Sequence, residues 1–314
     1  MRLYALVMMA AGCSEFNLED PDRSVQDPVF VQESFLHSTE PRIDILLVID
    51  DTASMTSEHQ MLRDELPTLV DTLQLADVSW QMGTITTDVT SPDAAILSGD
   101  PWVITSTMPN PITHLENMID VGTSGAQPEA GLGSTVLALT PPLINGANRG
   151  IRRNDAALHI VVISDGRDDS VGTLGSDPIN AAVAFLDDAS TISGQPSRLS
   201  ALVGPAPNGC TGSSGTALSG DGYLEVADAT GGHIQSICDI DFERLGEWIA
   251  NTSQPENPRF ELQAVPRPSS IRIQVNGERW DEGWVATEAP PAIQFTTAPP
   301  AGAEILIRYA VMSS

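Results

Sequence analysis

The chain has 314 residues, of which 41% are hydrophobic, and its formal net charge at pH 7 is −27. This length allows one large domain and a small one. Because the hydrophobic content is that of a globular protein, the high net charge does not indicate a disordered chain. All 15 basic residues are arginines. A chain this acidic is expected to repel nucleic acids and anionic lipid head groups, and to favour cations or a partner with a basic rim.

Residues 1–13 have the form of a short secretion signal. One arginine precedes an apolar run at 3–11, which is too short to span a bilayer and is followed by glycine and Cys13. The segment resembles a bacterial lipoprotein signal, in which small residues precede the cysteine that receives the lipid. The resemblance implies lipidation of Cys13 and, with Ser14 after it, an exported protein anchored to the bacterial outer membrane or cell surface. The alternative is an uncleaved apolar N-terminus or a misplaced start codon.

Residues 14–42 are acidic, contain three prolines and show no hydrophobic periodicity, so they are predicted to form a flexible tether. The next residues, Ile43–Ile49, include a single polar side chain, as expected of a strand buried on both faces of a parallel sheet. Apolar residues then recur at helical spacing from Ser54 to Leu75, and Pro67 is expected to bend or restart that helix.

Strands and helices are predicted to alternate along the rest of residues 43–253. The expected elements are a strand at 78–89, a hairpin or short strand pair at 94–106, helices near 112–119 and 128–139, a strand at 157–165, a helix at 178–189, a strand at 198–204, a helix near 223–229, a strand at 233–237 and a helix at 242–251. This alternation predicts an α/β domain with a doubly wound, mostly parallel sheet and helices on both faces.

A linker is predicted at 254–258, and the pattern beyond it changes to short strands. Residues 259–314 carry five arginines against six acidic residues, so almost all the acidity of the chain lies upstream. Asn276–Gly277 and pairs of prolines mark turns between the strands. We predict a small all-β domain here, similar in build to a β-sandwich.

The chain has three cysteines, Cys13, Cys210 and Cys238. If Cys13 carries lipid, the other two are left to pair, and the compartment of an exported protein permits a disulfide. Closing that loop is worth about 3–4 kcal/mol on the chain-entropy account. The alternative is a pair of free buried thiols.

Two apolar strands of the predicted sheet end in aspartate, at Asp50 and Asp165. Ligands of open α/β sheets bind at the carboxyl ends of the strands, so these carboxylates are expected to lie together. Thr52 and Ser54 alternate along the turn after the first strand and are able to point the same way. Carboxylates and hydroxyls are hard oxygen donors that suit Mg²⁺, with Mn²⁺ or Ca²⁺ as substitutes. The alternative is that Ser54 only caps a helix and Asp50 ends its strand by chance.

The sequence Asp50-x-Thr52-x-Ser54 resembles the D-x-S-x-S metal-ion-dependent adhesion motif of von Willebrand factor type A domains. Asp165 matches the aspartate that this family places at the end of its fourth strand. The resemblance implies that Thr52 and Ser54 bind the metal directly and that the aspartates commonly act through water. Thr in place of the first Ser, and Ala53 in place of the usual Gly, depart from the motif.

The family places a further ligand, a threonine, in a loop between the middle helices. Thr123 is the residue expected to match it, and Glu129 is the alternative. A glutamate bound directly would lower the residual charge of the metal and weaken its attraction for an acidic ligand.

Together these features predict a tethered, divalent-metal-dependent protein-binding module whose partner presents an acidic residue, and not an enzyme. One alternative is a structural protein that has kept the fold and lost its ligand. Another is a phosphatase that resembles the haloacid dehalogenases, which need an aspartate where this chain has Thr52 and a lysine that it lacks.

Overall fold

A computed structural model of the chain describes residues 29–37, 41–76, 78–212, 215–252, 258–297, 299–300 and 302–311. The predicted signal segment with Cys13 and most of the predicted linker lie outside the described residues. The chain divides into two compact units, one formed by residues 40–255 and the other by residues 1–39 together with 256–314. No helix in the described part of the chain is long and apolar enough to cross a membrane.

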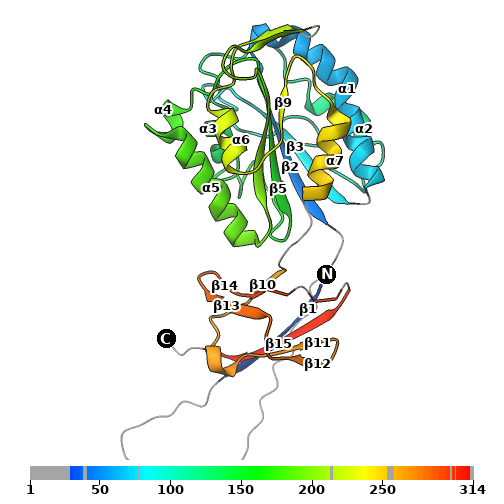
Figure 1. The fold of residues 1–314 in the computed structure, drawn as a ribbon, viewed down its shortest axis with the longest axis vertical. Coiled ribbons are helices and arrows are strands. Elements are labelled where there is room, and N and C mark those ends of the chain that lie inside the picture. Colours follow the sequence, from blue (N-terminus) through cyan, green and yellow to red (C-terminus); the bar gives the residue numbers. More distant parts are fainter. Residues whose placement is uncertain are drawn as a thin grey trace, which may run out of the picture. The chain divides into compact units, whose positions relative to one another are not determined.

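The α/β unit, residues 40–255, is built on a six-stranded sheet with the order β4-β3-β2-β5-β6-β9 (Figure 1). All neighbouring strands are parallel except β3 and β4. Since β3 lies on one side of β2 and β5 on the other, the strand order reverses between β2 and β5, where sheets of this kind bind ligands. The predicted doubly wound sheet is confirmed. Its strands are β2 (Arg42–Ile49), β3 (Ser79–Thr86), β4 (Ile104–Thr105), β5 (Ala157–Ile163), β6 (Ser197–Val203) and β9 (Ile234–Ser236).

Helices cover both faces of this sheet (Figure 1). Since side chains alternate along each buried strand, each strand contributes to the core on both faces. Ile45 and Leu47 of β2 lie in a core with α1, α2 and α7, whereas Leu46 and Val48 lie in a core with α3, α5 and α6. The helices are α1 (Thr56–Leu75), which follows the short 3-10 helix η1 (Ala53–Met55), α2 (Pro111–Met118), α3 (Gly131–Ala138), α4 (Val171–Leu174), α5 (Pro178–Ser193), α6 (Tyr223–Ala229) and α7 (Phe242–Thr252).

The second unit consists of two antiparallel sheets with the orders β1-β15-β11-β12 and β10-β14-β13. Phe260, Ile293 and Phe295 from one sheet share a buried core with Ile273 and Ile305 from the other. This arrangement confirms the all-β class predicted for the C-terminal residues. The strands are β1 (Phe30–Leu36), β10 (Arg259–Glu261), β11 (Arg272–Val275), β12 (Glu278–Trp280), β13 (Trp284–Glu288), β14 (Pro291–Phe295) and β15 (Glu304–Ala310), and the 3-10 helix η2 (Pro268–Ser270) precedes β11.

Part of the predicted tether is a strand of this β unit. Residues 30–36, inside the predicted tether 14–42, form β1, which pairs antiparallel with β15 along its whole length. The tether prediction is therefore wrong for these residues. The apolar–polar alternation expected of a strand is interrupted at Glu33, because this acidic side chain faces inward and is 7% exposed. It accepts hydrogen bonds from the hydroxyl of Tyr309 (2.6 Å) and the backbone N–H of Gln263 (3.0 Å).

Two local predictions in the α/β unit also differ from the structure, and one pair of short strands was not predicted. The predicted hairpin or strand pair at 94–106 is absent, and β4 pairs instead with β3. Helix α1 continues through Pro67 without a restart. The glycine-rich stretch after β6 forms a hairpin of β7 (Cys210–Gly212) and β8 (Gly215–Ala217) that sequence periodicity does not reveal, because each strand has three residues.

Candidate metal-binding site

The carboxyl ends of β2 and β5 meet at the centre of the sheet edge. The backbone N–H of Asp50 donates to the carbonyl of Ile163 (3.0 Å), which fixes the end of one strand against the end of the other. Asp50 is fully buried and Asp165 is 7% exposed. The topology thus places both predicted aspartates at one edge, as the strand pattern implies.

Hydrogen bonds join the four residues of the predicted motif. Asp50 Oδ1 accepts from the backbone N–H (2.9 Å) and the hydroxyl (2.7 Å) of Thr52. The hydroxyl oxygens of Thr52 and Ser54 lie 3.0 Å apart. Ser54 Oγ in turn donates to Asp165 Oδ1 (3.2 Å). The side-chain oxygens of Asp50, Thr52, Ser54 and Asp165 therefore converge, which is the arrangement that the sequence pattern predicts.

Two supporting residues were missed by the sequence analysis. Ser164 Oγ donates to Asp50 Oδ2 (2.7 Å) and accepts from the backbone N–H of Gly166 (3.0 Å). His59 Nε2 lies 2.7 Å from the carbonyl oxygen of Asp50. Ser164 directly precedes Asp165, so a hydroxyl at the end of β5 was the available signal. The sequence does not indicate the contact of His59 with the Asp50 carbonyl, because that contact depends on how α1 packs against the end of β2.

Glu129 supplies the third carboxylate of the site. One oxygen from each of Asp50, Glu129 and Asp165 lies within 4.8 Å of the others. The Glu129 carboxylate also lies against Gly166, where it occupies the space that a Cβ would need. The three carboxylates thus come from three separate segments of the chain.

The structure places Glu129, the alternative to Thr123, in the carboxylate cluster, and binding of the metal by Thr123 stays a prediction. No hydrogen bond among the described residues joins Thr123 to the cluster. Glu129 pairs with Asp88 in an isolated β-bridge, and the backbone N–H of Ala130 donates to the carbonyl of Thr87 (3.0 Å). These contacts hold the Glu129 segment beside the end of β3, six positions further along the chain than the expected threonine.

The electrostatics of the cluster are those of a site that lacks a positive charge. Burial raises the pKa of Glu129 to about 7, and the charges of Asp50 and Asp165 add to the shift. Burial also raises the pKa of Asp165, with a further contribution from Asp50. No arginine or histidine forms an ion pair with any of the three carboxylates in the described part of the chain. A cation would relieve this repulsion.

The negative field extends beyond the three clustered carboxylates. Burial raises the pKa of Asp51 to about 6, with contributions from the charges of Asp88 and Asp50. Burial also raises the pKa of Glu58, which is 2% exposed, with contributions from Asp165 and Asp50. Asp51 and Glu58 therefore add to the negative potential at the sheet edge.

The donor set fits a hard divalent cation. It consists of carboxylate oxygens from Asp50, Glu129 and Asp165 and hydroxyl oxygens from Thr52 and Ser54. Oxygen-only sites of this kind suit Mg²⁺, Mn²⁺ or Ca²⁺, whereas the absence of sulfur and imidazole from the set disfavours zinc.

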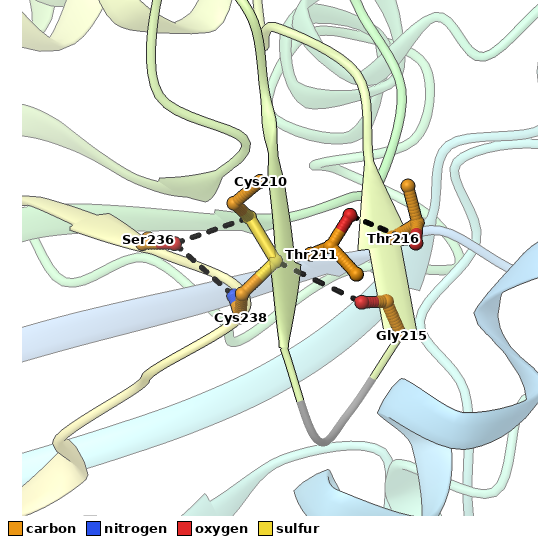
Figure 2. The surroundings of a disulfide bond; sticks show 6 residues. All are labelled: Cys210, Thr211, Gly215, Thr216, Ser236 and Cys238. Carbon is orange, nitrogen blue, oxygen red and sulfur yellow. Dashed lines mark hydrogen bonds between the residues drawn. A yellow bond between two sulfur atoms is a disulfide. The ribbon is translucent and has the colours of Figure 1, made fainter.

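A disulfide joins the β7–β8 hairpin to the segment after β9, next to the site (Figure 2). Cys210 and Cys238 are bonded, as the cysteine count predicts, and Ser236 Oγ donates to Cys210 Sγ (3.2 Å). Just beyond the hairpin, the backbone N–H of Leu218 donates to the carbonyl of Asp165 (2.8 Å). The bridge thus anchors a loop that touches the site.

Comparison with known proteins gave structural matches only. No family model and no curated protein matches this chain. A von Willebrand factor type A protein from Catenulispora acidiphila superimposes with a TM-score of 0.41 at 14% identity, covering 91% of this chain and 61% of that one. The pilus adhesin SpaC from Lactobacillus rhamnosus GG superimposes with a TM-score of 0.38 at 10% identity, covering 91% of this chain and 42% of that one.

Because these TM-scores are low, the fold is assigned on the sheet order and on the position of the motif at the end of β2. The α/β unit has a doubly wound, mostly parallel sheet, and the motif at the end of β2 resembles that of von Willebrand factor type A domains. This chain spans less than two thirds of the length of either matched structure. The function therefore has to be argued from the site.

Proposed function

We propose that the α/β unit is a divalent-metal-dependent protein-binding module of the adhesion type. The observation that carries the proposal is the convergence of three carboxylates and two hydroxyls, without a basic partner, at the strand-order reversal. Asp50, Thr52, Ser54, Asp165 and Glu129 would hold Mg²⁺, or Mn²⁺ or Ca²⁺ in its place. The bound cation supplies a Lewis-acidic contact for a negatively charged group.

The partner is proposed to present an acidic residue to this site. Three carboxylates outweigh a divalent cation by one negative charge, so a fourth is not attracted while all three are bound and ionised. We therefore propose that the partner's carboxylate takes the place of Glu129. The loop that carries Glu129 is exposed at Ala126 and Gln127, which leaves it accessible to a partner.

The same proposal places the protein outside the cytoplasm. The Cys210–Cys238 disulfide supports an oxidising compartment, since such bonds form and persist in exported proteins. Lipidation of Cys13 and attachment to the outer membrane or cell surface remain part of the proposal, carried by the lipoprotein-like signal alone.

The test is capture of partners from the surface proteins of the producing cells by the purified full chain. Capture is expected in Mg²⁺, to disappear in EDTA, and to return when Mg²⁺ or Mn²⁺ is restored. Asp165→Asn should abolish capture, whereas Asp187→Asn, an equal charge change at an exposed position of α5, should not. A complex that forms equally well in EDTA would point to the structural alternative, and a phosphatase assay on the same samples addresses the enzymatic one.

A further inference from the structure

A second feature, in the β unit, is independent of the metal site. Phe30, Ser270, Arg272 and Arg308 line a hollow of about 320 Å³. Phe30, Arg272 and Arg308 come from β1, β11 and β15, which are neighbours in the four-stranded sheet. The hollow lies on the outer face of that sheet, because residues of β15 and β11 that alternate with these arginines are buried in the core.

The hollow brings two like charges directly opposite each other. Arg272 and Arg308 are register partners in the antiparallel pairing of β11 with β15. Like charges in directly opposed positions destabilise a sheet. The guanidinium carbon of Arg308 lies 5.1 Å from the centre of the Phe30 ring, and Arg272 Nη1 donates to the carbonyl of Ile271 (2.7 Å). Neither contact neutralises a charge.

Five of the described arginines form ion pairs with carboxylates, whereas Arg272 and Arg308 are among those that do not. Arg279, on the neighbouring strand β12, binds Asp281 (2.6 Å), and four arginines of the α/β unit also form ion pairs. Among the described residues, neither Arg272 nor Arg308 forms an ion pair with a carboxylate, in a protein with 42 acidic residues against 15 basic ones. Two guanidinium groups on one face are suited to bind carboxylates with paired hydrogen bonds.

We propose that this hollow is a binding site for carboxylate-rich peptide and that its occupant is the chain's own acidic segment, residues 14–28. That segment contains five acidic residues and one arginine, so its charge complements the pair. It joins the described structure one residue before Phe30, whose ring lines the hollow. A segment tethered this closely is present at about millimolar effective concentration, which is sufficient for weak charge-assisted contacts to hold it.

The experiment uses a fluorescein-labelled peptide with the sequence of residues 14–28 and measures its binding to the full chain by fluorescence anisotropy at low salt. The amide variant of the chain carries Glu19→Gln, Asp20→Asn, Asp22→Asn and Asp27→Asn, which disables its own segment as a competitor. The peptide is expected to bind the amide variant about tenfold or more tightly than the unmodified chain, because the tethered segment no longer competes. Arg308→Gln in the amide variant should remove most of this binding, and Arg272→Gln with Arg308→Gln should abolish it.

Arg279→Gln in the amide variant is the matched control, since it removes one exposed arginine from the same sheet. It should leave peptide binding within about twofold, because this arginine already has an acidic partner. Equal binding to the unmodified chain and the amide variant would show that the acidic segment does not occupy the hollow. Binding that survives Arg272→Gln with Arg308→Gln, or that is absent from every variant, would show that the hollow is not the site.

Discussion

The two ends of strand β2 each bury an aspartate, and they do so in opposite ways. Asp44, near the amino end, and Asp50, just past the carboxyl end, are both 0% exposed. Asp44 accepts from Arg153 Nε (2.7 Å), from the Arg153 backbone N–H (2.6 Å) and from Arg152 Nη1 (3.3 Å). Asp50 has only hydroxyl and backbone donors, and two further carboxylates stand beside it.

Of these two buried aspartates, only Asp44 has a cationic partner among the described residues. At the amino end the protein supplies its own cations, so the buried carboxylate serves stability. At the carboxyl end the described residues supply none, and under the proposed function a divalent cation from solution neutralises the cluster. Burying an uncompensated charge costs several kcal/mol, so such a cluster is expected only where a bound ion offsets that cost.

The largest effect is expected from breaking the internal ion pair. Asp44→Asn leaves two guanidinium groups, 17% and 22% exposed, without their carboxylate. We expect a loss of about 3 kcal/mol in the free energy of unfolding of the α/β unit, at the low end of values for buried pairs because some exposure remains. Urea unfolding in EDTA measures it. Asp155→Asn, which removes the exposed partner of Arg42, is the control and should change stability little.

The opposite end should respond to metal rather than to mutation alone. With a divalent cation at 100 times its dissociation constant, the unmodified protein should gain about 2.7 kcal/mol of stability over the same protein in EDTA. Asp50→Asn should lose this gain, and in EDTA it should be no less stable than the unmodified protein, because it removes one of three mutually repelling charges. A large destabilisation of Asp50→Asn in EDTA would contradict the claim that the Asp50 charge adds repulsion in the metal-free protein.

Acidification should weaken the cation site. The pKa of Glu129 is raised to about 7 in the folded, metal-free protein, so its contribution to stability is present at low pH and is lost as the pH rises through 7. A cation needs the deprotonated form, so below pH 7 its affinity should fall by up to about tenfold per pH unit. Metal-induced shifts in melting temperature at pH 5.5 and 8.0 measure this. The dependence should flatten in Glu129→Gln, which should also bind metal more weakly.

The smallest effect is expected from a neutral ligand. Ser54→Ala removes the hydroxyl that joins Thr52 to Asp165. We expect the cation affinity to fall by about fivefold, because one contact with the free energy of a typical hydrogen bond is lost. Ser57→Ala, on the exposed side of the first turn of α1, makes the same chemical change away from the site. If both variants bind the cation equally well, the hydroxyl of Ser54 is not a ligand.

Much of the α/β unit is predictable because its strands are buried on both faces. Ile43–Ile49 and Ala157–Ile163 are mostly apolar runs that predict buried strands. Each run is closely followed by an aspartate of the site, so predicting the strands also locates these two aspartates. The disulfide was one of two alternatives drawn from a count of three cysteines and a predicted export signal. These predictions rest on local pattern, which the structure preserves.

The remaining features depend on contacts that are distant in the sequence. Strand β1 was missed because its inward-facing Glu33 is satisfied by Tyr309, 276 positions away. Glu129 was only an alternative, since its place depends on pairing with the end of β3. The unpaired arginines of the hollow become visible only when the register of β11 with β15 is known.

A Mn²⁺ titration of metal-free protein, with the unbound Mn²⁺ measured by electron paramagnetic resonance, tests directly whether the carboxylate cluster binds a divalent cation. We expect one tight Mn²⁺ site per chain, from which Mg²⁺ displaces the Mn²⁺. The site should be lost in Asp165→Asn and retained in Asp187→Asn. No tight site in the unmodified protein, or a site that Asp165→Asn leaves unchanged, would contradict the claim that the three clustered carboxylates await a cation.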